Sequence, residues 1–320
     1  MHDVTVVGPL NVDILVHGQA PPYLAVLTGW EGPAAIDLTV AGSVGYAVQD
    51  LARLGLTVSV SGCVADDVFG PVILQQLRDS GVSTDWVSTV PGTRSGIGVY
   101  VLAFGSKKRP LFYQLPTHDP WPLRFEQDQV DHMLDARLLH NGGFLHFQQM
   151  YSSGIVGLFS KARVRGLLTS VDTQFPLHKL KPPWMQVMLD VLPSIDIVFC
   201  DEHEAHGLTG IEAAAGAARI LLEAGARTVV IKQGTQGSDI FQKGWHHHEP
   251  AVRVSEVVDS IGAGDAYDAG FLTGMLENRP LPECSRMGSI CASRTVTAAG
   301  GCTGMPDRKQ VEALLAGPGK

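Results

Sequence analysis

The sequence predicts an α/β protein with a doubly wound, mainly parallel sheet flanked by helices, and a small β-sheet lid. Short apolar, β-branched runs alternate with longer helical patterns, as expected for consecutive βαβ units. Two segments, at about residues 14–40 and 95–115, interrupt this order with short apolar pieces and a period of two, which favours a separate small sheet. We expect a single domain over residues 1–320.

The individual elements follow from apolar periodicity and from glycine and proline breaks. Strands are expected at residues 4–7, 58–64, 144–147, 167–172, 195–200, 228–231 and 254–258. Helices are expected at residues 42–54, 72–78, 155–164, 184–192, 211–224 and 285–297, and from the glycine turn after residue 258 to about residue 277. Residues 246–248, three histidines in a row, are expected in a hairpin. Adjacent strand side chains point to opposite faces, which argues against all three binding one metal ion.

Composition and charge exclude several classes of protein. The chain is 45% hydrophobic and 18% charged, as in soluble globular proteins. Its net charge of −8 argues against a nucleic acid or an anionic membrane as partner. It contains no apolar run of about 18 residues and no signal-like start. The five cysteines are scattered, without a Cys-x-x-Cys pair, so we expect reduced thiols in a cytoplasmic enzyme.

A glycine turn near the C-terminal end carries the strongest functional signal. Gly262, Ala263 and Gly264 follow an apolar run and precede a helix, so unpaired backbone N–H groups point outward at the positive end of the helix dipole. Such a turn is an anion site that phosphate oxygens can approach closely. Asp265 follows at once, and a carboxylate beside a phosphate makes sense if it accepts a proton. The pattern therefore indicates a base for a hydroxyl that attacks a phosphoryl group.

The same stretch resembles a known family signature. Residues 259–265 read Asp-Ser-Ile-Gly-Ala-Gly-Asp, which is similar to the Asp-Thr-x-Gly-Ala-Gly-Asp of the ribokinase-like (PfkB) carbohydrate and nucleoside kinases, with Ser260 for threonine. The resemblance implies that residues 262–264 form the anion hole and that Asp265 is the catalytic base. The alternative is a tight turn whose aspartate caps a helix. No P-loop string occurs, and a dinucleotide fingerprint would need a third glycine at Tyr267.

The resemblance also implies a substrate site at the lid. Asn11 and Asp13 follow the first strand in the family's Gly-x-x-Asn-x-Asp pattern, where an Asx-turn is the alternative. The other residues expected at the substrate are Gly42, Tyr46, Arg94 and Gln149. Tyr46 replaces the family's sugar-contacting asparagine and brings an aromatic ring that could stack on a sugar or a base. Arg94 pairs with a substrate carboxylate or phosphate, or else belongs with residues 107–109 to a solvated lid turn.

A nucleotide site and two cation sites complete the implied machinery. Glu204 matches the family's Asn-x-x-Glu glutamate, which acts through water on Mg²⁺, and Asp201 replaces the asparagine; a solvated acidic helix start is the alternative. The remaining residues expected at ATP are Lys232, Gly234, Thr235 and Gly237. For a monovalent cation, K⁺, the expected ligands are the Asp259 carboxylate and the carbonyls of Ile261, Ala298 and Gly300.

These features predict ATP-dependent phosphoryl transfer to a hydroxyl of a sugar or a sugar-like small molecule. Because Tyr46 departs from the family pattern, we expect ribose not to be the best acceptor. A nucleoside kinase of the same family, or a non-catalytic sugar sensor with the same fold, are the alternatives. An exposed sheet edge has unpaired backbone N–H and C=O groups that another chain can cover, which favours a homodimer through the lid.

Overall fold

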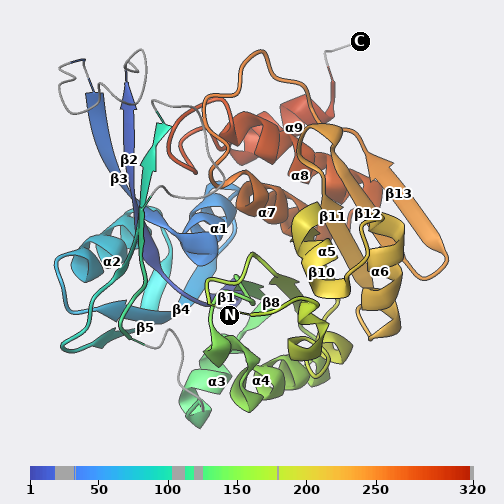
Figure 1. Ribbon diagram of the computed structural model, residues 1–320, viewed down its shortest axis with the longest axis horizontal. Coiled ribbons are helices and arrows are strands. Elements are labelled where there is room, and N and C mark those ends of the chain that lie inside the picture. Colours follow the sequence, from blue (N-terminus) through green and yellow to red (C-terminus); the bar gives the residue numbers. More distant parts are fainter. Residues whose placement is uncertain (19–31, 33, 103–111, 119–124, 179, 318–320) are drawn as a thin grey trace.

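Two sheets form the frame of the molecule (Figure 1). The computed structural model describes residues 1–18, 32, 34–102, 112–118, 125–178 and 180–317. The nine-stranded sheet has the order β13-β12-β11-β10-β9-β8-β1-β4-β5, and the four-stranded sheet has the order β3-β2-β6-β7. The strands of the large sheet are β1 (His2–Val7), β4 (Val58–Ala65), β5 (Ser83–Val90), β8 (Ala136–Gly142), β9 (Leu168–Asp172), β10 (Ile197–Asp201), β11 (Thr228–Lys232), β12 (Ser238–Gln242) and β13 (Trp245–Glu249).

The large sheet is mainly parallel, as the sequence predicts. Every neighbouring pair from β5 through β11 is parallel, and only the pairs β11–β12 and β12–β13 are antiparallel. Later strands add on both sides of β1, so the strand order reverses there. Ligands of open α/β sheets bind beyond the carboxyl ends of the strands at such a reversal. Asn11, Asp172, Asp201 and Lys232 all stand at or just after strand ends of this edge.

Helices cover both faces of the large sheet, each over its own apolar cluster. On one face pack α1 (Gly42–Arg53), α2 (Phe69–Asp79), α7 (Ala263–Leu276), α8 (Leu281–Thr295) and α9 (Arg308–Leu315). On the other pack α3 (Gln127–Met133), α4 (Ser153–Val164), α5 (Glu202–Thr209) and α6 (Ala214–Glu223). Short 3₁₀ segments lie at Gln148–Tyr151, Trp184–Val187, Leu192–Ser194 and Gly234–Gln236. The doubly wound prediction is therefore confirmed.

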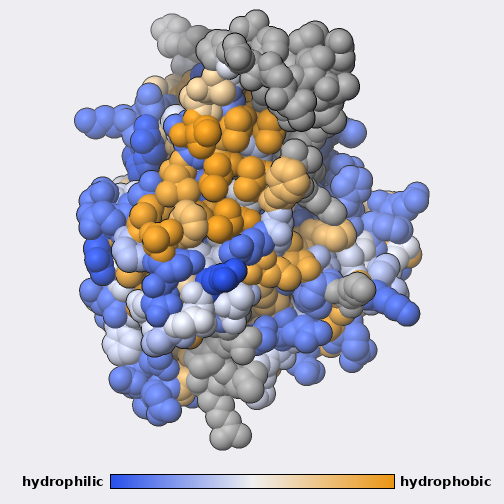
Figure 2. All heavy atoms as spheres, turned by 60° about the vertical axis from the view of Figure 1, so that its left-hand side comes forward, coloured by the Kyte–Doolittle hydropathy of each residue, from blue (hydrophilic) through white to orange (hydrophobic). Residues whose placement is uncertain are grey.

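The small sheet is the predicted lid. It consists of β2 (Asn11–Gly18), β3 (Ala34–Ala41), β6 (Gly96–Val101) and β7 (Phe112–Gln114). Strand register places Asp13, Gly98 and Tyr113 side by side on one face, which we call the inner lid face. The opposite, outer lid face carries Ile36 and Phe112, which are 71% and 66% exposed. Figure 2, which brings this side of the molecule forward, shows a contiguous apolar area there.

Three predicted elements are wrong. Residues 254–258 form no strand, because β11 is already paired with β10 and β12, and Val258 N–H instead bonds Val296 O next to the end of α8. Residues 144–147 form a turn, since the strand ends earlier, at Gly142, and Gly143 has φ +82°. Residues 184–192 give a 3₁₀ turn rather than a helix. In each case closely spaced apolar residues resembled the pattern of a regular element.

Across the described parts of the chain, no helix combines the length and the apolar character needed to cross a membrane.

Candidate active site

The anion turn begins α7 in the predicted way. Gly262 has φ +73°, a conformation that favours glycine, and a Cβ on it would stand 2.9 Å from the Cα of Gly301. A Cβ on Gly264 would stand 3.3 Å from Nζ of Lys232. The turn therefore lies against the 300–301 loop on one side and Lys232 on the other. The Ala263 N–H donates to Ser260 O at 3.4 Å, and the N-terminal end of a 14-residue helix is suited to an anion.

Asp265 lies in the first turn of α7 and is 8% exposed. Its Oδ1 accepts a hydrogen bond from Gln174 Nε2 at 3.5 Å. Burial raises the pKa of Asp265 well above its usual value, and the negative charge of Asp172 raises it further, against the effect of Lys232. A buried carboxylate with a raised pKa takes up a proton more readily, as a general base requires.

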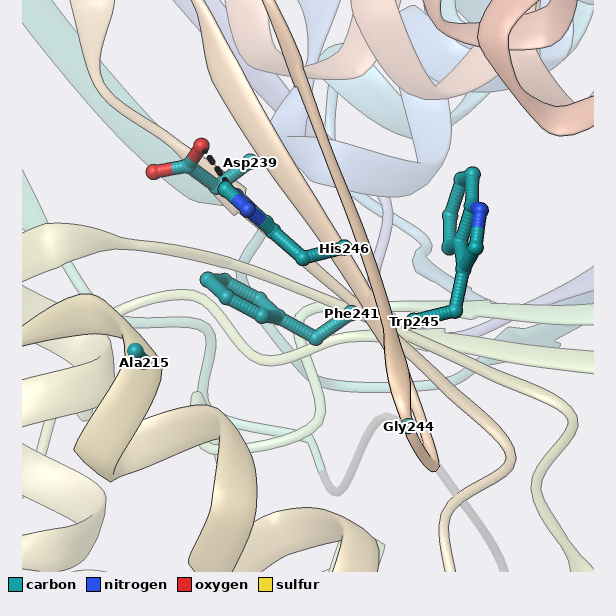
Figure 3. A pocket seen from close by; sticks show the side chains of 6 residues that line it. All are labelled: Ala215, Asp239, Phe241, Gly244, Trp245 and His246. Atoms are coloured by element: carbon teal, nitrogen blue, oxygen red, sulfur yellow. Dashed lines mark hydrogen bonds and ion pairs between the residues drawn. The ribbon is translucent and has the colours of Figure 1, made fainter.

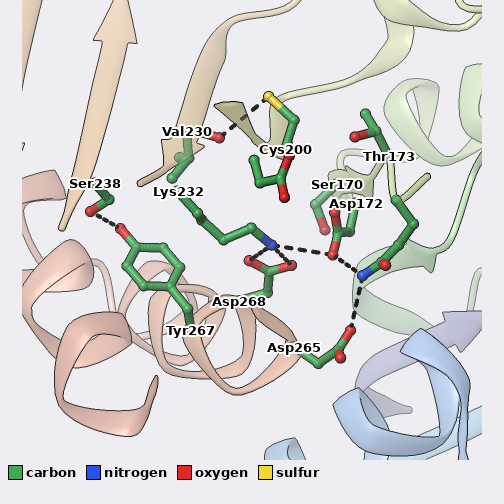
Figure 4. Close-up of polar contacts among 12 residues, drawn as sticks. Ser170, Asp172, Thr173, Cys200, Val230, Lys232, Ser238, Asp265, Tyr267 and Asp268 are labelled. Atoms are coloured by element: carbon green, nitrogen blue, oxygen red, sulfur yellow. Dashed lines mark hydrogen bonds and ion pairs between the residues drawn. The ribbon is translucent and has the colours of Figure 1, made fainter. Parts of the chain in front are cut away.

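Lys232, at the end of β11, ties two buried carboxyl groups together (Figure 4). Its Nζ lies 3.2 Å from Asp172 Oδ2 and 3.1 Å from Asp268 Oδ1. Burial acts to raise the pKa of Asp172, but Lys232 and a hydrogen bond from Asp268 lower it overall. Burial raises the pKa of Asp268 well above its usual value. The pKa values of the two carboxyl groups are therefore shifted in opposite directions, although both groups contact the same lysine.

Asp201 and Glu204 form a capping box at the start of α5. Asp201 Oδ1 accepts from Glu204 N–H at 2.8 Å, and Glu204 Oε2 accepts from Asp201 N–H at 2.9 Å and from Thr173 Oγ1 at 3.0 Å. Burial, followed by the charges of Asp172 and Asp201, raises the pKa of Glu204 to about 8. The alternative, a solvated acidic helix start, describes the local geometry only in part, because Glu204 is buried. A buried carboxyl at the strand edge also fits an outer-sphere role toward a hydrated Mg²⁺.

The predicted nucleotide turn follows Lys232 directly. Gly234 and Thr235 are exposed in the 3₁₀ segment Gly234–Gln236, and Gly237 has φ +105°. A Cβ on Gly237 would stand 2.0 Å from Glu249 O, so only glycine fits there. The turn projects from the same strand end that carries Lys232.

Asn11 and Asp13 lie at the base of the lid, both buried. Asp13 Oδ2 accepts from the Tyr46 hydroxyl at 2.7 Å, and burial raises the pKa of Asp13 to about 7. Asn11 Oδ1 is buried without a hydrogen-bond partner. Glycine makes room for both side chains, since a Cβ on Gly96 would stand 2.2 Å from Asn11 Oδ1 and one on Gly98 would stand 2.4 Å from Asp13 Oδ1. A buried, unsatisfied acceptor beside a carboxyl is suited to ligand hydroxyls.

Tyr46 has a different place from the one expected. Its ring is 4% exposed and packs with Leu15 and Ile261, and a Cβ on Gly301 would stand 2.2 Å from its Cε1. The ring therefore joins the lid base to the anion-turn region and leaves little surface for stacking. Two other tyrosines, Tyr100 and Tyr113, lie on the inner lid face near Asp13, whose charge contributes, after burial, to raising the pKa of both. Sequence reasoning missed them because only strand register shows which face they occupy.

Two of the residues expected at the cation, Ile261 and Gly300, contact Asp259 through their backbone N–H groups. Asp259 Oδ1 accepts from Ile261 N–H at 2.9 Å and Asp259 Oδ2 from Gly300 N–H at 3.1 Å. The carboxylate thus links the anion turn to the 300 loop, and Ala298 stands two residues before that loop. Within the described residues no group of three His, Cys, Asp or Glu side chains could hold a metal ion. A cation here would therefore depend on backbone carbonyls.

Three substrate predictions remain: Arg94, Gln149 and Gly42. Arg94 is exposed between β5 and β6, and its N–H and O contact Thr117. Residues 107–109 lie outside the described residues. Gln149 does not end a strand, because the chain after β8 turns into the 3₁₀ segment Gln148–Tyr151. Gly42, with φ +74°, approaches Asn11 Nδ2 and begins α1 at the lid base.

Sequence reasoning also missed two polar residues. Asp268 is one helical turn beyond Asp265, but its lysine partner is 36 residues away. Gln174 carries no motif, and its role depends on two carboxyl groups, Asp172 two residues before it and Asp265, which is 91 residues away on α7.

A separate open hollow of about 400 Å³ lies at the β12–β13 edge (Figure 3). It is lined by Ala215, Asp239, Phe241, Gly244, Trp245 and His246. His246 and His248 both contact Asp239 Oδ1, at 2.8 and 2.9 Å, while His247 contacts Glu249 on the opposite face. The predicted hairpin and its alternation are confirmed. None of the predicted site residues lines this hollow.

Comparison with known proteins assigns this fold and site to a class. A family model described as pfkB family carbohydrate kinase matches residues 47–308. The chain is 28% identical to ribokinase of Arabidopsis thaliana over 321 residues, 98% of this chain and 80% of that protein. The fold matches that of Arabidopsis thaliana ribokinase complexed with ribose and ATP with a TM-score of 0.81, at 24% identity and 98% coverage of both chains. It also matches a fructokinase double mutant of Vibrio cholerae O395 in fructose, ADP and potassium ion bound form, with a TM-score of 0.82, at 18% identity and 98% coverage of both chains.

These matches define a phosphotransferase with a hydroxyl acceptor. The chain belongs to the pfkB family of carbohydrate kinases.

Proposed function

We propose that this protein is an ATP-dependent kinase that phosphorylates a hydroxyl of a neutral sugar or polyol. One observation carries the proposal: the buried carboxyl of Asp265 lies in the first turn of α7, directly after the anion turn, and Gln174 links it to Asp172 of the Lys232 cluster. A base within reach of both an acceptor hydroxyl and a phosphate site is what phosphoryl transfer requires. That related ribokinase was solved with ribose and ATP supports the assignment.

In the proposed reaction, Asp265 removes the proton of the acceptor hydroxyl as its oxygen attacks the γ-phosphorus, and the bond to the bridging oxygen breaks to leave ADP. The N–H groups of residues 262–264 stabilise the negative charge on the transferred group. Glu204, at the strand edge, would hold the water shell of Mg²⁺, which neutralises phosphate charge when bound. Gly234, Thr235 and Gly237 would form part of the nucleotide surface, and Asp201 keeps Glu204 in place through the capping box.

A neutral acceptor fits the lid base best. The groups there are acceptors, Asn11 Oδ1 and the Asp13 carboxyl, which suit hydroxyl donors. Tyr100 and Tyr113 on the inner lid face offer rings for the apolar face of a sugar. Arg94 is exposed and contacts Thr117 through its backbone, so an anionic substrate has less support. With the asparagine of the family replaced by a buried Tyr46, ribose is not expected to be the best acceptor.

Two further parts of the proposal concern a cation and a partner. Asp259 and the carbonyls of Ile261, Ala298 and Gly300 would bind K⁺ behind the anion turn, and a related fructokinase was solved with a potassium ion. The apolar outer lid face, with Ile36 and Phe112 exposed, would be covered by a second copy of the chain. A cytoplasmic location stays a prediction.

The test is ADP release by the purified protein with ATP and Mg²⁺ over a panel of pentoses, hexoses, polyols, sugar acids and nucleosides. The expected result is a neutral sugar or polyol other than ribose with the highest kcat/KM. A nucleoside with the highest kcat/KM would contradict the acceptor class. Binding of a sugar by thermal shift without acceptor-dependent ADP release would contradict the kinase assignment and favour a sensor.

A further inference from the structure

One residue next to the proposed base has an uncommon backbone conformation. Gln174 has φ +52°, and Asn278 is the only other non-glycine residue with positive φ in the described parts of the chain. A long side chain in this left-handed region costs free energy, and such residues persist where their neighbours hold them. Gln174 follows β9 at the carboxyl edge of the sheet. A strained residue therefore lies at the edge of the sheet where the predicted site residues gather.

The preceding two residues fix this conformation. Asp172 O accepts from the N–H groups of Gly143 and Phe144, and Thr173 O accepts from Leu145 N–H. Thr173 N–H donates to Phe199 O on β10. The backbone before Gln174 is therefore hydrogen-bonded to β10 and to the segment that follows β8. These bonds, rather than an intrinsic preference of glutamine, determine where its side chain points.

The Gln174 amide bridges two carboxyl groups. Its Nε2 donates to Asp172 Oδ2 at 2.9 Å and to Asp265 Oδ1 at 3.5 Å. Both neighbours are acceptors, so the amide nitrogen rather than the oxygen must face them. An NH₂ group has two hydrogens, which matches two carboxyl oxygens. The longer contact is the one to the group that must also meet a substrate, and it leaves Oδ2 of Asp265 without a bond from Gln174.

Three consecutive residues thus contact three ionisable groups of the site. Asp172 contacts Lys232, Thr173 donates to Glu204, and Gln174 donates to Asp265. The segment connects the nucleotide side to the base. Without the amide, the charge of Asp172 would act on Asp265 with no donor between them.

We propose that Gln174 is a positioning residue that holds the Asp265 carboxylate in place and separates it from Asp172. The inference rests on the proposed function of Asp265 as the base. In the resting enzyme the amide fixes Oδ1, so that Oδ2 faces the acceptor hydroxyl. The strain at φ +52° is the cost of bringing a side-chain donor to this point from a strand end.

The test compares Gln174→Glu, Gln174→Gly and Gln75→Glu. Glutamate has the same size as glutamine but lacks the donor, and glycine relieves the backbone strain but lacks the side chain. Gln75→Glu is the matched control, because Gln75 Nε2 donates to Asp79 Oδ1 at 2.8 Å on the exposed face of α2, away from the site.

Both Gln174 variants should lower kcat by roughly 10–100-fold with a smaller change in KM, as expected for a misplaced base. In Gln174→Glu the acidic limb of the kcat/KM profile should move up by about one pH unit or more, since a third carboxyl group disfavours ionised Asp265. Asp265 interacts with titratable groups from several elements, all of which remain in place: Asp172, Lys232, Asp50, Asp268, Cys302 and Tyr100. Gln75→Glu should change neither kcat nor the limb.

Two results would overturn the proposal. Wild-type kcat in Gln174→Gly would show that the amide is not needed, and an unmoved acidic limb in Gln174→Glu would show that the residue does not act on Asp265. Carboxyl ¹³C titration of Asp265, assigned by its loss in Asp265→Asn, gives a readout without turnover. An Asp265 pKa that rises in Gln174→Glu while the wild type phosphorylates no acceptor would keep the positioning role and reject the proposed function.

Discussion

The two halves of the site hold their polar groups in opposite ways. The sheet half comprises Asp172, Glu204, Lys232 and Asp268. The lid half comprises Asn11, Asp13, Tyr46, Tyr100 and Tyr113. In the sheet half a lysine neutralises two buried carboxyl groups before any ligand is present. In the lid half, as far as the structure describes the chain, Asp13 has a tyrosine hydroxyl but no ion pair, and Asn11 Oδ1 has no partner.

This difference separates groups that hold the structure together from groups that await a ligand. A buried pair with its own counter-ion is preformed, and breaking it costs stability. A buried acceptor without a partner is costly in the free protein and gains its hydrogen bond when a hydroxyl binds. Variants of the sheet half should therefore change stability, while variants of the lid half should change activity and acceptor binding.

The largest effect is expected for Asp13→Ala. The variant loses the carboxyl that meets the acceptor hydroxyls, so kcat/KM should fall by about 10³-fold or more on the best acceptor, without loss of stability. Acceptor-dependent ADP release and circular dichroism measure the two. Asp37→Ala on β3 of the same lid is the control and should keep near wild-type activity. Normal kcat and KM in Asp13→Ala would show that the lid half does not bind the acceptor.

Lys232→Met tests the sheet half. It leaves Asp172 and Asp268 without their cation, so the free energy of unfolding should fall by about 3–5 kcal/mol, measured by urea denaturation. Adding Asp172→Asn to the same chain should recover part of the loss. A change below about 1 kcal/mol would show that the cluster does not stabilise the fold.

Asp50, on α1, is expected to make the stability of the protein depend on pH. Asp50 is fully buried, and burial raises its pKa to about 8 against the opposing effect of a hydrogen bond from the Cys302 thiol. The folded protein thus favours protonated Asp50, so its contribution to stability is complete below about pH 4 and is lost as pH rises through 8. Melting temperature should fall over that range, and Asp50→Asn should flatten the dependence. An equal slope in the variant would assign it to other groups.

The smallest effect is expected for the monovalent cation. Potassium should raise the rate a few-fold over a large organic cation at equal ionic strength, because a cation beside Asp259 would orient the anion turn. Indistinguishable rates would leave Asp259 with its two backbone hydrogen bonds as its only function.

How much the sequence predicts depends on how local the information is. Residues 259–265 are consecutive and lie in one turn, so the sequence alone was enough to predict the glycine turn and the start of α7. Asp13 was also accessible, since it follows β1 almost at once. By contrast, Lys232 and Asp172 meet across 60 residues because β9, β10 and β11 pair in parallel, and no local pattern records that register.

The errors have the same origin. Residues 254–258 contain three valines and residues 144–147 contain two phenylalanines, yet neither segment pairs with a strand of the sheet. Tyr46 was expected to offer a ring for stacking, but its position on the buried side of α1 places it against Gly301. The rings on the inner lid face are those of Tyr100 and Tyr113. Propensity and motif predict what a segment can do, and packing decides which surface it reaches.

The central claim is that Asp265 is the base between the two halves, and single-turnover phosphoryl transfer by Asp265→Asn tests it most directly. The account predicts an intact fold, ATP affinity within about threefold of wild type, and a chemical step slower by about 10²–10⁴-fold, the usual contribution of a positioned general base. A variant that keeps more than half of the wild-type rate would contradict it.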